Sequence, residues 1–393
     1  MRVAERLRRE LAELGRRSQL RSLELAPAPD FSSNDYLGLA VDPRLKQAVA
    51  GGLAGAEPAA ATGSRLLSGH SERWNELESD FARWIGAEAA LFFTSGYLAN
   101  IGLLAAVLSP EDTVFSDSAN HASLIDGIRL SKARRVVFPH LDLSFLEDAL
   151  RSESATGARF IVVESVFSME GDRTPLAELA ALAERHGAEL IVDEAHAIGV
   201  FGPGGRGAVA EAGLADRVFA VVCTCGKALA SSGAFVCGSA TLRQFLINRA
   251  RTLIFSTALP PYFAAHVRAG WELAAEADAE RARLAANAKL LRDDLRARDF
   301  DLLRSQSQIV PVVLGENERA VAVAEQLRAA GFGVRAIRPP TVAPGTARLR
   351  ISVTARHSES VLRELAAAIE AAARLPEGTA RTRAATARRQ AAR

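Results

Sequence analysis

An acid, an imidazole and an amine stand at the ends of two apolar runs in the middle of this chain. The run Leu190–Asp193 ends in the acid and is followed by His196, and the run Val218–Thr224 is followed by Lys227. Each run is short enough to be a buried strand, and open α/β proteins hold ligands at strand ends. A lysine buried there loses affinity for its proton and becomes a nucleophile. The pattern therefore predicts an amine that bonds a carbonyl carbon.

Pyridoxal phosphate is a cofactor that requires this combination of groups. Its aldehyde forms a Schiff base with a lysine, and a carboxylate keeps its ring nitrogen protonated so that the ring accepts the electrons of a carbanion. We expect Lys227 as the Schiff-base amine, Asp193 at the ring nitrogen and His196 at the ring hydroxyl. The competing interpretation is structural, with Asp193 capping a turn beside a satisfied histidine and Lys227 at the surface.

Two further strand ends carry residues that suit such a cofactor. Gly96 and Tyr97 open a helix after an apolar run, where free backbone N–H groups form an anion site. We expect this turn to hold the cofactor phosphate, although a plain strand-to-helix turn fits equally well. His121 follows the run Thr113–Ser116 and can stack on a pyridine ring, but taken alone it is better explained as a helix cap.

A serine and an arginine extend the candidate site. Ser168 follows the run Phe160–Glu164 and can bond a cofactor oxygen, while turn chemistry alone also explains its segment. Arg350 alternates with apolar neighbours in a C-terminal run, so it faces away from them in a strand. Its planar guanidinium suits a substrate carboxylate. Surface charge is the simpler interpretation for Arg338 and Arg348.

Two other motif interpretations lack the context that they need. Asp193–His196 reads Asp-Glu-Ala-His, as in a helicase box, but the phosphate loop that such an enzyme requires is missing from the sequence. The glycine-rich segment Gly202–Gly207 does not bridge a strand and a helix, and its Pro203 has no N–H to donate to a dinucleotide. We set both interpretations aside.

Short apolar runs alternate with helical patterns through much of the chain, which predicts a largely parallel sheet with both faces covered. The last two runs are close enough in sequence to predict an antiparallel edge. The expected strands are Ala90–Phe93, Thr113–Ser116, Arg135–Pro139, Phe160–Glu164, Leu190–Asp193, Val218–Thr224 and Ala234–Cys237, and the helical patterns include Ser71–Ile85, Leu98–Leu108, Leu143–Leu150 and Leu176–Arg185.

The C-terminal third predicts a small α+β lobe. A long helical stretch runs from Tyr262 to about Arg298, followed by strands near Ile309–Val313, Val334–Ile337 and Arg348–Val353 and a last helix Ser358–Ala373. Apolar residues of the first segment recur at helical spacing and predict an amphipathic helix packed on the body: Val3, Leu7, Leu11 and Leu14. The predicted domains are an N-terminal helix and lead-in (1–45), a large cofactor-binding domain (46–260), a small C-terminal domain (261–375) and a disordered basic tail (376–393).

Composition narrows the class of protein. The chain has 393 residues, 49% hydrophobic and 24% charged, which is ordinary for a globular protein too long for one small core. The net charge of +2 and the solvated basic tail give little reason to expect a nucleic-acid partner. Three cysteines form neither a disulfide framework nor a zinc site. We expect a cytoplasmic protein without a metal or a membrane-spanning segment.

Taken in order, these segments resemble the α-oxoamine synthases, which share the fold-type I scaffold of pyridoxal-phosphate enzymes. The resemblance runs from about Asp30 to Ala373. It implies a mostly parallel seven-stranded α/β sheet, a smaller C-terminal α+β domain and a homodimer. The matching segments are Asn34–Gly38, Gly63–Arg65, Thr94–Asn100, Asn120–Ser123, Asp193–His196, Gly199–Gly202, Gly226-Lys227 and Phe255–Pro261.

The resemblance also implies a role for each candidate residue. Lys227 abstracts the α-proton of the amino acid, His121 stacks on the cofactor ring and Arg350 grips the amino-acid carboxylate. The implied catalytic residues are Lys227, His121, Asp193 and His196; the implied cofactor-binding residues are Gly96, Tyr97, His121, Ser168, Asp193, His196, Thr224, Lys227 and, from a partner subunit, Thr257; the implied substrate-binding residues are Asn34, Thr341 and Arg350.

The segments Ile337–Val342 and Gly345–Ile351 carry the substrate prediction. Within the family they favour decarboxylative condensation of L-alanine with a pimeloyl thioester, carried by coenzyme A or a carrier protein, to 8-amino-7-oxononanoate in biotin biosynthesis. A sibling synthase such as glycine C-acetyltransferase, with another amino acid and acyl group, is the alternative. Trp74 and Cys225 depart from the family pattern and could signal a different acyl preference. A non-catalytic pyridoxal-phosphate-binding regulator is less expected, because no helix-turn-helix segment precedes Asp30.

Overall fold

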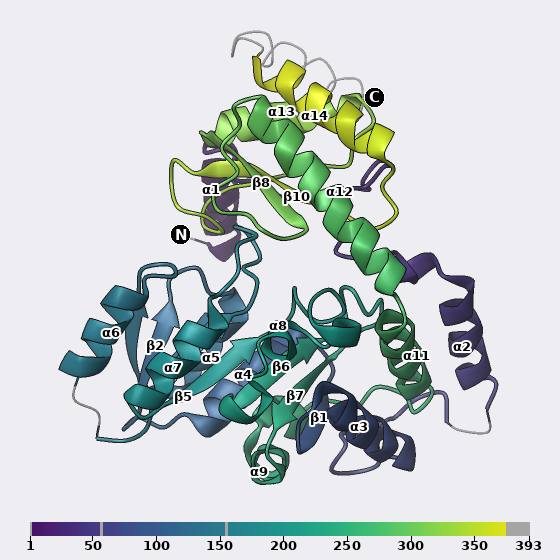
Figure 1. Cartoon of the computed structure of the whole chain (residues 1–393), viewed down its shortest axis with the longest axis vertical. Helices are drawn as coiled ribbons and strands as arrows, with labels where there is room; N and C mark the ends of the chain where they lie inside the picture. The colour runs from purple at the N-terminus through teal and green to yellow at the C-terminus, as the bar shows by residue number, and fades with distance from the viewer. Residues whose placement is uncertain (1, 56–57, 154–155, 375–393) are drawn as a thin grey trace. The chain divides into compact units, whose positions relative to one another are not determined.

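The computed structural model describes residues 2–55, 58–153 and 156–374, which form two compact units (Figure 1). The large unit contains Asp35–Ser168 and Arg173–Arg281, and the small unit contains residues up to Asn34, Met169–Asp172 and the chain from Ala282 onward. Both units therefore combine segments that are distant in sequence. The domain boundaries expected at 45, 260 and 375 stay predictions, and the expected tail 376–393 lies outside the described residues.

A seven-stranded sheet forms the centre of the large unit, in the order β1-β7-β6-β5-β4-β2-β3. The pairs β2–β3, β2–β4, β4–β5 and β5–β6 are parallel, whereas β1–β7 and β6–β7 are antiparallel. This architecture confirms the predicted mostly parallel α/β sheet. The strands are β1 (Ala89–Phe93), β2 (Thr113–Asp117), β3 (Arg134–Phe138), β4 (Arg159–Glu164), β5 (Ala188–Asp193), β6 (Ala220–Thr224) and β7 (Ala234–Gly238).

Helices cover the sheet and close its apolar core (Figure 1). The helix α4, for example, packs Leu103 and Leu104 against strand residues such as Val114 and Val222, all with no exposed surface. Strands buried on both faces read as continuous apolar runs, which is why their positions are visible in the sequence. The helices of this unit are α2 (Pro43–Leu53), α3 (Glu72–Ile85), α4 (Gly96–Val107), α5 (Ala122–Ser131), α6 (Leu143–Ser152), α7 (Leu176–Arg185), α8 (Ala208–Glu211), α9 (Ala240–Arg249), α10 (Arg251–Ile254) and α11 (Phe263–Ala275).

The register of the parallel strands aligns the chemically active ends. Glu164 at the end of β4 pairs with Asp193 at the end of β5, and Asp193 pairs with Val222 near the end of β6. Residues that follow these strands therefore emerge along one edge of the sheet, where open α/β sheets bind ligands.

The predicted antiparallel edge is half right. β6 and β7 pair antiparallel, with Thr224 opposite Ala234, but β7 lies inside the sheet because β1 pairs with its other side. The outer strand is β1, which lies far earlier in the chain. The sequence of the β6 and β7 runs therefore does not indicate that β1 pairs beside them.

The helical stretch expected from Tyr262 to about Arg298 is present, but it consists of two helices. The chain forms α11 and then α12 (Asp278–Ala297), with a break between them. Arg281 explains the break, because its guanidinium donates to the carbonyl oxygens of Ala274 and Ala275 at the end of α11. A cation that bonds the last carbonyl groups stabilises a helix end.

The small unit contains a three-stranded antiparallel sheet in the order β8-β10-β9. Its strands are β8 (Ile309–Gly315), β9 (Arg335–Ile337) and β10 (Ala347–Ser352), close to the expected runs. Besides most of α12, the unit holds α13 (Asn317–Ala329), which the prediction omitted, and α14 (Glu359–Arg374).

The first helix, α1 (Val3–Arg16), forms where the heptad-like spacing predicts it, but it is not packed on the body. Val3, Leu7, Leu11 and Leu14 are all exposed, and none of the residues of α1 is buried. Its apolar stripe therefore lacks a covering surface within the described part of this chain.

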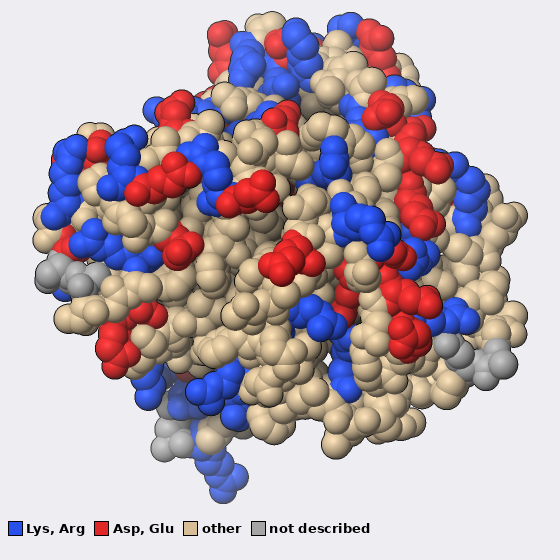
Figure 2. Space-filling model, turned by 60° about the horizontal axis from the view of Figure 1, so that its bottom comes forward, with Lys and Arg blue, Asp and Glu red and all other residues tan. Residues whose placement is uncertain are grey.

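The surface carries charges of both signs, and red and blue side chains are interspersed on the face shown in Figure 2. Among the described residues, no helix combines the length and apolar character needed to cross a bilayer.

Candidate active site

Lys227, His196 and Tyr36 form a line of polar contacts at the end of β6. Lys227 follows β6, and its Nζ lies 2.9 Å from His196 Nε2. The other ring nitrogen of His196, Nδ1, lies 2.7 Å from the hydroxyl oxygen of Tyr36. Tyr36 is fully buried and His196 nearly so. The structure thus brings together Lys227 and His196 as predicted and adds a tyrosine.

A second network begins at Asp193, the last residue of β5. The side-chain amide of Asn100 on α4 donates to Asp193 Oδ2 at 2.7 Å and to Ser123 Oγ at 2.9 Å. The Ser123 hydroxyl in turn lies 2.8 Å from Nδ1 of His121. Three separate elements therefore hold the acid and the imidazole in one hydrogen-bonded chain.

This network fixes the proton position on His121. His121 is the N-cap of α5, and its Nδ1 accepts the backbone N–H of Ser123 at 3.2 Å. A nitrogen that accepts a backbone N–H carries no proton, so the neutral ring carries its proton on Nε2. Lost hydration lowers the pKa of His121, the Lys227 charge adds to the lowering, and Asp193 opposes it. His121 both caps its helix and keeps part of its surface exposed at the site.

Glu194 lies directly behind Asp193 and is completely buried. Its carboxylate accepts the backbone N–H groups of Ala208 at 3.0 Å and Val209 at 2.6 Å, and the hydroxyl of Ser165 at 3.0 Å. Burial raises the pKa of Glu194 to about 7 against these stabilising hydrogen bonds. The residue holds the first turn of α8 at the strand end that carries Asp193.

The expected phosphate-binding turn lies at the start of α4. Ser95 caps this helix by accepting the N–H of Leu98 at 3.2 Å. Gly96 approaches Thr224 so closely that a β-carbon at position 96 would lie 2.6 Å from Thr224 Cγ2. The side chain of Tyr97 donates to Asp126, which raises the pKa of the tyrosine. Gly96 and Thr224, predicted to hold the cofactor from different elements, are neighbours.

These residues fit pyridoxal phosphate. Asp193 receives only the neutral donors Asn100 and backbone Ala195 in the contacts described, so oxygen lone pairs remain for a protonated ring nitrogen. The glycine at position 96 leaves backbone N–H groups of α4 open to an anion. Lys227 is half-buried beside His196, as a covalently bonding amine requires.

Other predicted site residues belong to the small unit. Arg350 on β10 is buried and donates through Nη1 and Nη2 to Asn34 Oδ1, at 3.2 Å each, and through Nη1 to Ser352 Oγ at 2.8 Å. Thr341 lies elsewhere on the unit and accepts a hydrogen bond from Arg21 at 3.3 Å. The structure thus joins Asn34 to Arg350.

Arg348, two residues earlier on β10, is buried rather than a surface charge. It pairs with Glu170 at 3.1 Å and donates to the carbonyl of Met169 at 3.4 Å. Alternation along the strand places Arg348 and Arg350 on the same face. Arg338 is half-buried and donates to the carbonyl of Ser18 at 2.6 Å.

Two further predicted residues lie on other segments of the large unit. Ser168 is buried beyond the end of β4. Thr257 forms a β-bridge with Ser64 and, together with Arg65 and Thr94, lines a small hollow beside β1. Their contacts with a cofactor stay predictions.

Comparison with known proteins assigns the chain to a family. The family model described as aminotransferase class I and II matches residues 28–369. The chain belongs to that family. An 8-amino-7-oxononanoate synthase from Aromatoleum aromaticum is 46% identical over 380 residues, covering 93% of this chain and 98% of the relative. One from Burkholderia thailandensis is 48% identical over 353 residues, covering 87% and 89%.

Solved structures agree with this assignment. A serine palmitoyltransferase variant from S. paucimobilis with a bound PLP–myriocin aldimine superposes with a TM-score of 0.88 at 30% identity, covering 95% of this chain and 99% of that one. An 8-amino-7-oxononanoate synthase from Francisella tularensis superposes with a TM-score of 0.75 at 31% identity, covering 87% and 96%. The fold-type I architecture is therefore confirmed.

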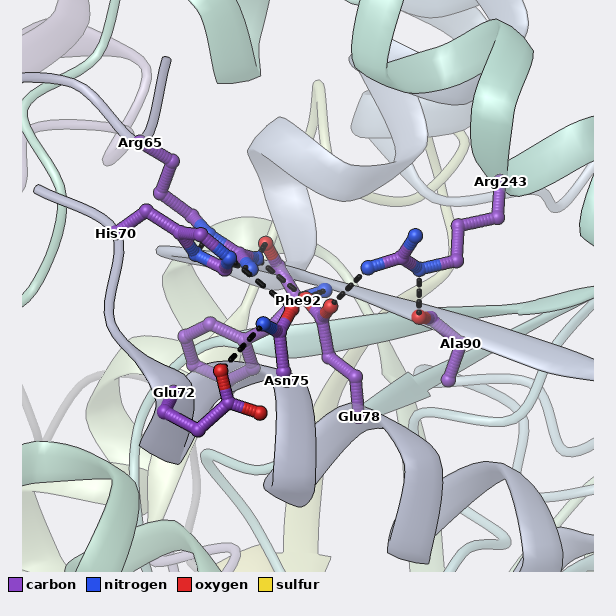
Figure 3. Close-up of polar contacts among 8 residues, drawn as sticks. All are labelled: Arg65, His70, Glu72, Asn75, Glu78, Ala90, Phe92 and Arg243. Atoms are coloured by element: carbon purple, nitrogen blue, oxygen red, sulfur yellow. Dashed lines mark hydrogen bonds and ion pairs between the residues drawn. The ribbon is translucent and has the colours of Figure 1, made fainter. Parts of the chain in front are cut away.

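A second cluster of polar side chains lies near β1, apart from the candidate site around Lys227 (Figure 3). Buried Glu78 on α3 pairs with Arg65, accepts the N–H of Phe92 at 2.7 Å, and pairs with Arg243 of α9 at 2.9 Å. Arg243 also donates to the carbonyl of Ala90 at 3.2 Å. This cluster, called the Glu78 cluster below, joins α3, α9 and β1.

The sequence interpretation missed Tyr36, Asn100 and Glu194 as members of the site. Tyr36 and Asn100 belong to matching family segments, but their partners are 160 and 93 residues away in the chain. Glu194 lies between two predicted residues and differs from them only in its complete burial. No local pattern distinguishes these three from structural residues.

Proposed function

We propose that the protein is an 8-amino-7-oxononanoate synthase that condenses L-alanine with a pimeloyl thioester, with loss of carbon dioxide, in biotin biosynthesis. The observation that carries the proposal is the 46–48% identity to enzymes of that name over most of both chains. The clustering of Lys227, His196, Asp193 and His121 at strand ends of one sheet supports the underlying chemistry.

Pyridoxal phosphate, when bound, supplies an aldehyde that captures the amino acid and a ring that stabilises the negative charge left after its α-proton departs. Lys227 would hold the cofactor covalently, and its amine would accept that proton. Asp193 keeps a positive charge on the ring nitrogen, held in place by Asn100. His121, with its proton on Nε2, presents a flat polar ring to stack against the cofactor and a donor toward the substrate.

The remaining predicted contacts extend this assignment. The N–H groups at Gly96 and Tyr97, together with Thr224, hold the phosphate or neighbouring oxygens, and Ser168 bonds a cofactor oxygen. In the small unit, Arg350 binds the amino-acid carboxylate. Two of its N–H groups share the single oxygen of Asn34, and the two oxygens of a carboxylate match this pair of donors better than one amide oxygen does. Asn34 and Thr341 contribute to substrate binding.

We further propose a cytoplasmic homodimer in which Thr257 reaches the phosphate of the partner subunit. The exposed apolar stripe of α1, followed in the same unit by the strongly exposed Leu23 and Leu25, supports a covered surface in the assembly. All three cysteines are buried and unpaired, which suits a reducing compartment. Sedimentation at micromolar concentration tests the dimer, and a monomer would contradict it.

The test of function uses purified protein loaded with pyridoxal phosphate. It is mixed with pimeloyl-CoA and, in separate reactions, with alanine, glycine or serine, and mass spectrometry searches for the decarboxylated aminoketone. Product from alanine supports the proposal. Product from serine or glycine alone would assign a sibling synthase, a candidate favoured by the TM-score of 0.88 to a serine palmitoyltransferase. Replacing pimeloyl-CoA with the carrier-protein thioester identifies the acyl donor.

A further inference from the structure

We propose that Tyr36 is a positioning residue of the reaction, which holds His196 in the orientation that the cofactor site needs. The inference rests on the proposed function only in that the site binds pyridoxal phosphate. Tyr36 has no exposed surface, its hydroxyl oxygen lies 2.7 Å from His196 Nδ1, and its ring is tilted 51° from the imidazole at 6.1 Å. Both residues belong to the large unit.

The hydroxyl fixes which nitrogen of His196 faces the site. With Nδ1 bound to Tyr36, Nε2 is directed at Lys227, 2.9 Å from its Nζ. A ring flip would exchange a nitrogen for a carbon at both ends and lose both contacts. The hydrogen bond therefore orients the imidazole before any ligand binds.

A tyrosine suits this position better than a group that can only donate or only accept a hydrogen bond. When Lys227 is an ammonium it donates to Nε2, and the proton of His196 then lies on Nδ1 and is donated to the tyrosine oxygen. When Nε2 carries the proton, toward a neutral amine or a cofactor oxygen, the Tyr36 O–H donates to Nδ1. A hydroxyl serves both states because it can donate and accept. Phenylalanine fills the same volume and serves neither.

The charged and titratable groups around His196 come from several elements of the large unit. Asp193 and Glu194 precede it on the same loop, Lys227 faces it from the end of β6, and His121 lies close enough to Lys227 and Asp193 for their charges to shift its pKa. Tyr36 enters from the segment before α2, and its contribution is a neutral hydrogen bond rather than a charge.

The test compares Y36F with Y262F, the same change at a tyrosine outside the networks described above. Without substrate, Y36F should weaken cofactor binding roughly three- to tenfold, as expected for one lost hydrogen bond, and shift the absorption maximum of the bound cofactor. Y262F should change neither. Thermal unfolding of each protein checks that it is folded.

A double-mutant cycle separates positioning from a merely structural role. If Tyr36 acts through His196, Y36F should leave cofactor binding and its spectrum unchanged in an H196N background. Equal effects of Y36F with and without His196 would overturn the proposal, as would wild-type binding in Y36F. Because these readouts need no product, they stay informative even if the reaction proposed above proves to be another one.

Discussion

The large unit holds two clusters of buried polar side chains, one around Glu78 and one around Lys227. In the Glu78 cluster a carboxylate lies between the guanidinium groups of Arg65 and Arg243, and the N–H of Phe92 completes its bonds. Around Lys227 the acid is Asp193, and its described donors are an amide and a backbone N–H, which carry no charge.

The difference separates a site that stabilises the fold from one that is prepared for a ligand. Opposite charges compensate each other inside the Glu78 cluster, so removing one partner leaves buried charge behind. The described donors of Asp193 are neutral and leave oxygen lone pairs for a cationic atom, such as a protonated ring nitrogen. Changes at the first cluster should alter stability, and changes at the second should alter chemistry.

The largest effect is expected for K227A. Under the proposed function, loss of this amine removes both the covalent attachment and the base, so we expect turnover to fall by about 10⁴-fold, at the upper end for a single acid–base group. The thermal midpoint should change little. The control is K289A, at a surface lysine paired with Asp293. Turnover of K227A within tenfold of wild type would show that the site lies elsewhere.

E78Q should show the opposite behaviour. Its neutral amide leaves Arg65 and Arg243 uncompensated, which should cost about 3 kcal/mol of unfolding free energy. Turnover per folded molecule should stay near wild type. The matched change E359Q removes an exposed partner of Arg363 and should cost less than about 1 kcal/mol. Denaturant titration measures the loss of unfolding free energy in both variants. Equal losses would contradict the stabilising role of the Glu78 cluster.

Asp193 and Asp117 provide a closer comparison, because each ends a strand of the same sheet and is buried. D193N should reduce turnover by about 10²-fold, a typical loss for one preorganised electrostatic group, and should weaken cofactor binding. D117N removes an acid bonded to His140 and to the N–H groups of Ala119 and Leu141, so it should lower stability and leave the cofactor spectrum unchanged. Identical spectra for the two variants would argue against Asp193 at the ring nitrogen.

The smallest effect concerns Glu194 and pH. Its pKa is about 7 in the folded protein, above the ordinary value of 4.5 that the unfolded chain should show, so folding takes up a proton between these values. Protonated Glu194 costs no stability below pH 4.5. As pH rises above 4.5, the unfolded chain releases the proton more readily than the folded protein, so the free energy of unfolding falls until pH has passed 7. Between pH 6 and pH 8 the loss should be about 1 kcal/mol.

The variant E194Q should flatten that dependence, because an amide does not titrate. The comparison uses the slopes of unfolding free energy against pH, so a constant loss of stability in the variant does not obscure it. Equal slopes for the two proteins would show that Glu194 titrates near its ordinary pKa.

Much of the fold could be predicted because its strands are buried on both faces and read as apolar runs. The limits are long-range. Arg281 ends α11 by binding its last carbonyl groups, although the Ala-rich sequence there favours a continuous helix. Likewise β1 pairs with β7, which is distant in sequence. The apolar stripe of α1 is not covered by any other segment of the described chain.

The candidate site divides in the same way. Asp193, His196 and Lys227 could be predicted because their chemistry is distinctive and they follow recognisable strands. Tyr36 and Asn100 could not, because a tyrosine and an asparagine are common structural residues and only the folded chain reveals their partners. The sequence predicts which groups react, and the tertiary structure shows which side chains hold those groups in place.

Asn100 illustrates what this means for protein engineering. Both of its N–H donors are committed, to Asp193 and Ser123, and its Oδ1 has no hydrogen-bond partner among the described residues. Aspartate at this position would set a second charge against Asp193, and a longer glutamine would displace both bonds. A substitution library over the chain should therefore find position 100 nearly as intolerant as the reacting residues, although its amide is directed at other side chains and not at a reacting atom.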